Sequence, residues 1–443
     1  MRTLTLLLLT ILLGTPVHAQ QKKTRDQKVR EDREKVTTAG HWIYNDLETG
    51  FRNARQTGKP LLVVLRCIPC EECVKLDDDL VDNDPVLKPL LEQFVCVRVV
   101  STNGLDLSLF QFDTDQSFAV FMLNADRTIY GRFGTRSHRT EWIGDVSLKG
   151  LAAALQGALD LHQRFPAVRQ SLLKKNGPPP LHRTPEQMPG LRDKYTSQLN
   201  YSGDVVKSCI HCHQIGDSIR DQYRAEDKAI PEVVLNPYPH PRSLGLVLNP
   251  DEAATVREVQ PDSLAAAAGF RAEDHILSLN GQPLLSIADV QWVLQGIEPE
   301  GGTVTADVQS QESRRTITLK LPAGWRRLSD ISWRVSAWGL RRMATGGMKL
   351  EPVEPAERGR NGIPETGMAL LVRHLGQYGA HAAAKNAGFL QGDIVISIDG
   401  RTDLLSDSDV LRYGVTEKRA GEQVSVTVVR AGRQQTLLLP MQQ

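Results

Sequence analysis

The feature that most constrains this chain is an apolar run that leads into a group of cysteines. Residues 61–65 are Leu-Leu-Val-Val-Leu, and Cys67, Cys70 and Cys73 follow shortly after. A short run of apolar, partly β-branched residues predicts a buried strand. The acidic residues between Cys70 and Cys73 suit the first turn of a helix. Unpaired N–H groups and the positive end of the helix dipole at such a junction stabilise a thiolate.

A CxxC pair between a strand and a helix predicts a thiol–disulfide redox site, because the thiolate is the form that attacks disulfides. Two alternatives remain: a permanent structural disulfide, and half of a zinc site. Cys73 would share a helix face with Cys70, so it either relays a disulfide or is a small buried residue. Cys96 lies in an apolar run and is expected to be an inert core thiol.

The surrounding pattern predicts one α/β domain over residues 39–165. Its expected elements are a helix near 47–54, the strand before Cys67, a short helix near 85–91, a strand at 94–100, a hairpin at 118–133 and a helix from 147. This order resembles the thioredoxin superfamily. The resemblance implies that Cys67 attacks and Cys70 resolves. The chain departs from that family at Arg66, where thioredoxins carry Trp, and at Ser117, where they place a cis-proline.

The amino terminus predicts export. A basic start, an apolar run at 4–13 and Ala19 at a small-residue cleavage site are typical of a signal peptide over residues 1–19. The mature protein is therefore expected to be periplasmic or secreted, in an oxidising compartment. Residues 20–38 are dominated by charged and amide side chains and predict a solvated linker. No later apolar run is long enough to span a bilayer.

A second cysteine motif lies in residues 166–241, which predict an irregular or helical linker. Cys209, Cys212 and His213 form a CxxCH sequence, which in an exported protein is typical of covalent c-type haem attachment, with the histidine as a ligand of the iron. Two alternatives remain open: a zinc site made by the two cysteines with His213 or His211, and a second dithiol pair. The expected cofactor is therefore haem, with zinc or none as the alternative.

The last third of the chain contains a repeat. The sequence of residues 268–281 recurs in similar form at 387–400, and such self-similarity indicates two copies of one unit. Each copy reads as an Ala-rich helix stopped by Gly, a strand and an Asn-Gly or Asp-Gly turn. Both resemble PDZ domains, mainly β-folds with two helices. We expect the first copy at 242–323 and the second at 324–443.

The PDZ resemblance implies a loop whose backbone N–H groups hold a peptide carboxylate, followed by an edge strand that pairs with the peptide. In the first copy the matching residues are Leu244, Gly245 and Leu246. In the second copy they are Trp338, Gly339 and Leu340. The alternative is that one or both copies are rigid spacers.

The order of signal peptide, thioredoxin-like domain, CxxCH segment and two PDZ units resembles a family of exported bacterial thioredoxin-like/PDZ (seleno)proteins. We therefore expect an exported thiol–disulfide oxidoreductase, with a redox-active disulfide at the first CxxC and electron transfer through a haem. Its expected partners are a thiol or disulfide substrate protein and a peptide or protein bound by the PDZ units. The alternative is a non-catalytic adaptor whose domains only bind proteins.

Two other classes are disfavoured. The net charge of +1 and the lack of a basic stripe give no basis for nucleic-acid binding. A protease is disfavoured because the sequence has no Gly-x-Ser-Gly nucleophile motif and no room for a protease domain.

Overall fold

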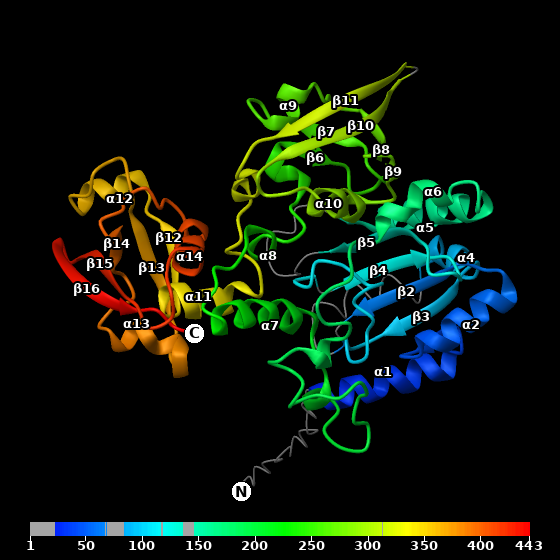
Figure 1. Ribbon diagram of the computed structural model, residues 1–443, viewed down its shortest axis with the longest axis horizontal. Helices are drawn as coiled ribbons and strands as arrows, with labels where there is room; N and C mark the ends of the chain where they lie inside the picture. The colour runs from blue at the N-terminus through cyan, green and yellow to red at the C-terminus, as the bar shows by residue number, and fades with distance from the viewer. Residues whose placement is uncertain (1–22, 67, 69–83, 117, 136–145, 312) are drawn as a thin grey trace, which may run out of the picture.

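We analysed a computed structural model of the chain. It describes residues 23–66, 68, 84–116, 118–135, 146–311 and 313–443. The chain forms three domains: an amino-terminal domain built on a five-stranded sheet, a middle domain above it, and a carboxy-terminal domain to one side (Figure 1). No helix in the described ranges is long and apolar enough to cross a membrane.

The sheet of the amino-terminal domain has the strand order β1-β3-β2-β4-β5. Strands β1, β3 and β2 are parallel, whereas β4 and β5 run antiparallel to their neighbours. The strands are β1 (Trp42–Tyr44), β2 (Leu61–Arg66), β3 (Val95–Val99), β4 (Phe118–Leu123) and β5 (Ile129–Thr135). The helices are α1 (Arg25–Ala39), α2 (Leu47–Thr57), α4 (Leu87–Leu91) and α5 (Leu148–Gln163).

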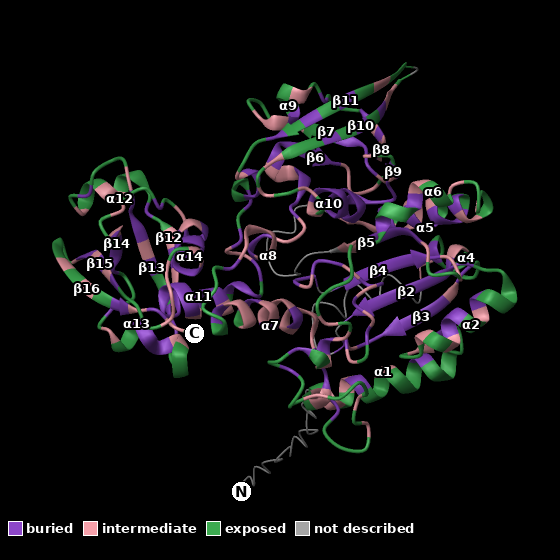
Figure 2. Cartoon of the chain, in the orientation of Figure 1, coloured by how far each residue is buried: buried purple, intermediate pink, exposed green. Residues whose placement is uncertain are grey.

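Strand β2 is buried along its whole length, as Figure 2 shows for the centre of the sheet. Leu62 and Val64 pack toward α5, whereas the intervening Leu61, Val63 and Leu65 pack toward α2. A strand covered on both faces needs a continuous apolar sequence rather than an alternating one. This explains why residues 61–65 are all apolar.

The predicted linker at residues 20–38 is instead largely helix α1. Thr24 caps the helix together with Gln27, and Val29 and Val36 are almost completely buried. Asp32 forms an ion pair with the buried Arg98, with 3.0 Å between Oδ1 and Nη1. Two valines on one face are enough to attach the helix, and its remaining polar residues form the solvated face.

The predicted linker at 166–241 is also packed structure. Met188, Leu191, Ile210 and Ile215 join the core cluster on the α2 face of the sheet. Its elements are α6 (Arg169–Leu172), η1 (Leu173–Lys175), η2 (Pro185–Gln187), η3 (Val206–Ser208), α7 (Cys212–Ala225) and α8 (Glu232–Leu235). The segment contains few apolar residues and most of its turns are short, so the sequence gives little periodic signal of this packing.

The middle domain contains a four-stranded sheet of order β11-β10-β8-β9 and a separate β6-β7 pair. Its strands are β6 (Leu246–Leu248), β7 (Val256–Val259), β8 (His275–Leu279), β9 (Gln282–Pro283), β10 (Gly302–Ser310) and β11 (Ser313–Leu321). Its helices are η4 (Pro241–Leu244), α9 (Leu264–Ala268) and α10 (Ile287–Gln295), and η5 (Trp325–Leu328) follows the domain.

The carboxy-terminal domain has a five-stranded antiparallel sheet of order β12-β13-β14-β15-β16. The strands are β12 (Met348–Pro352), β13 (Leu370–Leu375), β14 (Ile394–Ile398), β15 (Gln423–Arg430) and β16 (Arg433–Pro440). The helices are α11 (Ala337–Thr345), α12 (Pro355–Arg360), η6 (Gly379–Ala382), α13 (Ala383–Asn386) and α14 (Asp407–Thr416). Strand β12 lies at one edge of this sheet.

Helix α10 of the middle domain docks on the amino-terminal domain. Leu285, just before α10, belongs to the core cluster of the amino-terminal sheet. Trp292 donates its indole N–H to the carbonyl of Lys174 at 3.0 Å. The Arg132 guanidinium on β5 lies 3.8 Å from the centroid of the Trp292 ring. The two domains therefore share one continuous buried interface.

A buried charge pair lies within that interface. Lys175 Nζ is 3.0 Å from Asp289 Oδ2, and both side chains are 1% exposed. Asp289 also accepts hydrogen bonds from the backbone N–H groups of Arg132 and Leu285. Burial lowers the pKa of Lys175 despite the nearby carboxylate. A buried charge that loses its partner is strongly destabilising, so this pair fixes how the domains dock.

We expect Asp289→Ala to lower the free energy of unfolding by about 3–5 kcal/mol, because it leaves the Lys175 ammonium buried without a counter-charge. The matched control is Lys149→Ala, which removes an exposed ion pair with Asp251 across the same interface and should cost about 1 kcal/mol or less. Urea unfolding followed by tryptophan fluorescence measures both. Equal small effects would show that the buried pair does not hold the interface.

Candidate functional site

The predicted catalytic residues Cys67, Cys70 and Cys73 lie outside the described residues, so their roles stay predictions. The residues on either side of Cys67 are described. Arg66 ends β2 and is buried. Ile68 is 2% exposed and packs with Val100 and Val205. The chain that enters the first CxxC motif is therefore anchored at the carboxyl end of β2, next to the segment that carries the second motif.

The CxxCH motif lies against this same edge of the sheet. Cys209 directly follows η3, and Cys212 is the first residue of α7. Between them, the carbonyl of Ile210 accepts hydrogen bonds from the backbone N–H and the hydroxyl of Thr102, just beyond β3. Cys212 lines a small cavity together with Arg66. Tertiary structure thus brings the second cysteine pair beside the end of β2.

Both thiols of this second pair have raised pKa values, although Cys209 is buried and Cys212 is half-buried. Cys209 is 3% exposed, and its thiol donates to the carbonyl of Val205 at 3.3 Å. Burial raises the pKa of Cys209 to about 11, and the nearby Asp26 carboxylate adds to the shift. Burial also raises the pKa of Cys212 to about 12. Both cysteines are free thiols in the structure.

The two histidines of the motif lie on the same side of it. The rings of His211 and His213 are stacked, with centroids 5.9 Å apart. His213 Nδ1 is 3.2 Å from Asp217 Oδ2, one turn further along α7. Burial lowers the pKa of His211, and the neighbouring His213 and Arg25 side chains add to the shift. His211 is therefore neutral at neutral pH.

The described surroundings of the motif leave little enclosed space for a covalently attached haem. Haem attachment requires both thiols to face one cavity, and small-molecule pockets measure about 300–1,000 Å³. In the described part of the chain, the cavity lined by Ile210, His211 and Cys212 measures about 10 Å³, roughly the space that one water molecule needs. Ile210 itself is 1% exposed. We derive no chemical step through haem.

The zinc alternative also lacks a complete donor set in the described ranges. A structural zinc site uses four protein ligands, and a catalytic site uses three. Among the described residues, no group of three or more cysteine, histidine or carboxylate side chains is placed to share a metal ion. Of the three sequence alternatives, a second dithiol fits the described geometry best.

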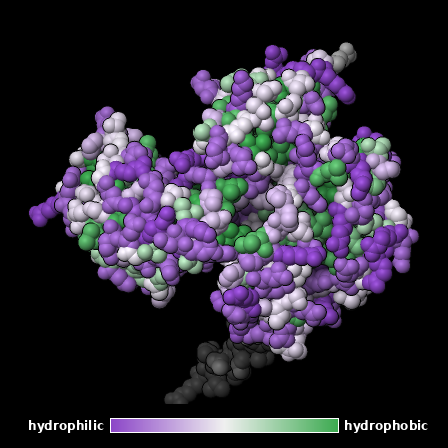
Figure 3. All heavy atoms as spheres, viewed as in Figure 1, coloured by the Kyte–Doolittle hydropathy of each residue, from purple (hydrophilic) through white to green (hydrophobic). Residues whose placement is uncertain are grey.

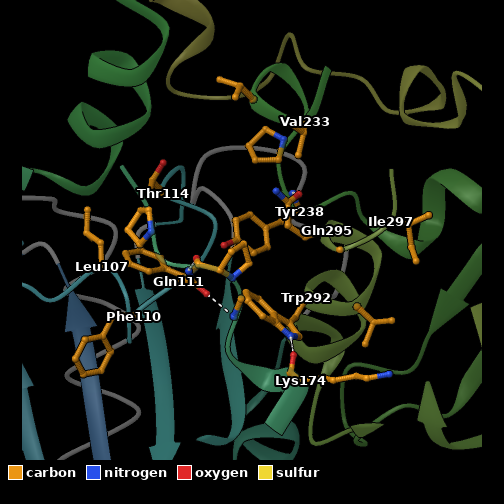
Figure 4. Close-up of a pocket in the computed structure, with 18 of the residues that line it drawn as sticks. Leu107, Phe110, Gln111, Thr114, Lys174, Val233, Tyr238, Trp292, Gln295 and Ile297 are labelled. Atoms are coloured by element: carbon orange, nitrogen blue, oxygen red, sulfur yellow. Dashed lines mark hydrogen bonds between the residues drawn. The ribbon is translucent and has the colours of Figure 1, made fainter. Parts of the chain in front are cut away.

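A larger cavity opens where the amino-terminal domain, the CxxCH segment and the middle domain meet. Its volume is about 950 Å³. Hydrophobic side chains border the hollow on the molecular surface (Figure 3). Figure 4 shows Leu107 and Gln111 on one side of the cavity and Tyr238 and Trp292 on the other. The residues that line this cavity come from distant parts of the chain, so no single sequence motif predicts it.

The loop predicted to bind a carboxylate in the middle domain does precede a strand that is paired on one side only. Leu244 ends η4, and Leu246 begins β6, which pairs with β7 alone among the described strands. Gly245 between them has a φ of +82°, and a Cβ there would lie 2.1 Å from Ser263 Cβ. Only glycine fits this position, so Gly245 is required by the fold itself.

The loop predicted in the carboxy-terminal domain is placed differently. Trp338, Gly339 and Leu340 lie inside helix α11, and Leu340 is fully buried. Their N–H groups donate to the carbonyls of Val335 and Ser336, just before the helix, so these three residues do not form a carboxylate-binding loop. The loop before edge strand β12 is instead Gly346–Gly347, with φ values of +59° and +90°. The pair Gly346-Gly347 is the sequence signal that could have located this loop.

Comparisons with protein families identify all three domains. Residues 42–125 match a thioredoxin-like family, and residues 255–309 and 379–440 match two PDZ domain families. The chain therefore contains a thioredoxin-like domain followed by two PDZ domains, called PDZ1 and PDZ2 below. This confirms the predicted α/β thioredoxin-like fold followed by two mainly-β PDZ units.

Solved structures resemble only parts of the chain. A substituted form of the HtrA-type protease AlgW with a decapeptide is 19% identical over 32% of this chain and 40% of that one, with a TM-score of 0.21. AlgW itself with a decapeptide is 17% identical over 33% and 51%, with a TM-score of 0.20. An aminopeptidase N family protein from Idiomarina loihiensis is 22% identical over 22% and 13%, with a TM-score of 0.17.

This chain thus spans from about an eighth to about half of the length of those proteins. Likenesses this slight carry no inference about protease or peptidase activity. No curated protein matches the chain.

We expect iodoacetamide to label Cys209 and Cys212 slowly in the native protein at pH 8 and rapidly after denaturation, as measured by mass spectrometry. The raised pKa values keep both thiols protonated until the pH approaches about 11 to 12. Because the folded state holds these protons more tightly than the unfolded state, their contribution to stability is fully present below the free-thiol value of about 8.5 and is lost as pH rises from there through the folded values. Rapid labelling of the folded protein at pH 8 would contradict the burial of this pair.

Proposed function

We propose that this protein is an exported thiol–disulfide redox protein whose reactive pair is Cys67 and Cys70. The observation that carries the proposal is the position of the first CxxC motif in a thioredoxin-like domain. Strand β2 is central in the sheet and ends at Arg66, so Cys67 follows directly at the carboxyl edge. A thiol at the end of a strand and before a helix is the one most readily ionised.

The chemistry follows from two neighbouring thiols. The thiolate of Cys67 attacks one sulfur of a substrate disulfide and releases the other as a thiol, which leaves a mixed disulfide. The second thiol, Cys70, then attacks Cys67 Sγ and releases the reduced substrate. Two electrons and two protons pass from the protein dithiol to the substrate, and the protein disulfide remains. The reverse sequence oxidises a substrate dithiol.

The Cys209–Cys212 pair has a different role in this proposal. Its protonated, desolvated thiols are poor nucleophiles at neutral pH, so this pair is not the attacking site. It is a second dithiol beside the proposed reactive edge. Its position supports this role, since Cys212 and Arg66 line one small cavity. A covalent haem is the competing proposal for this pair.

The PDZ domains indicate peptide or protein binding, and we propose that they hold the redox partner. PDZ1 is fixed to the thioredoxin-like domain through α10 and the Lys175–Asp289 pair. A partner held by a docked PDZ domain stays close to the reactive edge, which raises its effective concentration there. Removing the PDZ domains therefore slows reaction with a protein substrate more than reaction with a small disulfide.

Thiol titration tests the redox proposal. We expect one cysteine of the first cluster to be alkylated at a pH well below the free-thiol value of about 8.5, and the Cys67–Cys70 disulfide to form reversibly in a glutathione buffer. The internal control is Cys96, whose pKa is raised because its thiol is completely buried. A first cluster as inert as Cys96, or one permanently bridged, would leave the adaptor function instead.

An absorption spectrum tests the haem proposal separately. Protein exported from a host with haem-attachment machinery should show no Soret band if Cys209 and Cys212 form a dithiol. A haem that stays on the polypeptide after acid and organic solvent, and is lost in Cys209→Ala/Cys212→Ala, would replace the dithiol assignment with haem.

A further inference from the structure

Helix α11 packs against the two elements that would border a peptide-binding groove in PDZ2. In a PDZ domain the ligand adds a strand to the edge of the sheet, which here is β12, and α14 forms the opposite wall. Helix α11 packs against both α14 and β12. In Figure 1, α11 lies beside α14 at the side of the domain that faces the rest of the molecule.

A buried arginine anchors α11 in the groove. Arg341 Nη2 donates to Asp407 Oδ2 at 2.6 Å, and both side chains are buried. The other oxygen of Asp407 accepts the backbone N–H of Leu350 on β12 at 3.1 Å. Asp407 thus bridges from α14 to the edge strand, and one N–H that a ligand strand would use is already bonded.

Apolar contacts fill the rest of the groove. Leu340, Met343 and Ala344 of α11 share a buried cluster with Leu411 and Val415 of α14. The fit is close, because a Cβ added at Gly414 would lie only 2.5 Å from the Cβ of Ala344. Gly414 is therefore the residue that lets α11 approach α14.

The end of α11 also blocks the carboxylate-binding loop. The backbone N–H of Gly347 donates to the carbonyl of Arg341 at 2.9 Å. The hydroxyl of Thr345 lies 2.7 Å from the carbonyl of Met348. A bound peptide carboxylate would accept hydrogen bonds from such N–H groups. Here the Arg341 carbonyl of α11 accepts the hydrogen bond from Gly347 instead.

We propose that α11 is an internal ligand of PDZ2, and that the groove binds a partner segment with a basic residue for Asp407 and apolar residues for Leu411 and Val415. The charge and apolar pattern of α11 define this partner chemistry. The proposal rests on the peptide-binding part of the proposed function and is independent of the thiol chemistry.

A tether keeps the groove closed. Just before α11, Ser336 donates its backbone N–H and its hydroxyl to the carboxylate of Asp115, at 3.0 and 2.9 Å. Arg334 pairs with the same carboxylate and with Asp113, and all three side chains are buried. An internal ligand held this way has a high effective concentration, so an external peptide competes only when α11 is weakened.

Two variants open the groove by different routes. Gly414→Ala pushes α11 away sterically, and Arg341→Ala removes its anchor. The matched control for the first variant is Gly359→Ala in α12, where an added Cβ meets nothing within 4 Å. The matched control for the second is Arg342→Ala, also on α11, which removes a more exposed ion pair with Asp221 of α7. The probe is a labelled synthetic peptide with the sequence of residues 336–347, added to the full-length protein.

We expect both opening variants to bind this peptide at least about tenfold more tightly than wild type or the controls, which corresponds to about 1.4 kcal/mol. Hydrogen exchange should speed up in α11 and β12 and stay unchanged in the thioredoxin-like sheet. A peptide with alanine in place of Arg341 should bind more weakly. Faster exchange without any gain in peptide binding by Gly414→Ala would overturn the proposal, because α11 would then be a structural helix only. Neither readout involves the cysteines, so a failed redox proposal would leave both results unchanged.

Discussion

The arrangement of this protein depends on the buried pair of Lys175 and Asp289. Each charge is costly to bury alone, and the two are placed by different domains, so the pair is satisfied only in the docked arrangement. Arg132 and Trp292 stack beside it and seal the interface. This docking fixes PDZ1 against β5 and thereby sets one wall of the central cavity.

The second cysteine pair lies beside the edge where β2 ends, although the two segments are far apart in the sequence. Ile68 packs against Val205, and Cys212 shares a cavity with Arg66. Desolvation raises the pKa values of Cys209 and Cys212, so both thiols stay protonated at neutral pH. In the proposed function the first CxxC motif supplies the reactive thiols, and this second pair does not attack.

Helix α11 connects this edge to PDZ2. At its start, Ser336 bonds to Asp115, which lies just before β4 in the thioredoxin-like domain. Near its end, Arg341 bonds to Asp407 in the PDZ2 groove. Helix α11 is therefore held by buried hydrogen bonds to both domains.

The sequence by itself determined the three folded domains, because apolar runs such as 61–65 and the repeat at 268–281 and 387–400 are local patterns. It failed where packing rather than periodicity decides. Val29 and Val36 attach a helix that composition marks as a linker, and Trp338–Leu340 form a helix where a glycine suggested a loop. The burial of Cys209, the central cavity and the partners of Arg341 and Asp289 were decided only by tertiary structure. Each depends on groups from separate segments, whose desolvation and pairing no local pattern encodes.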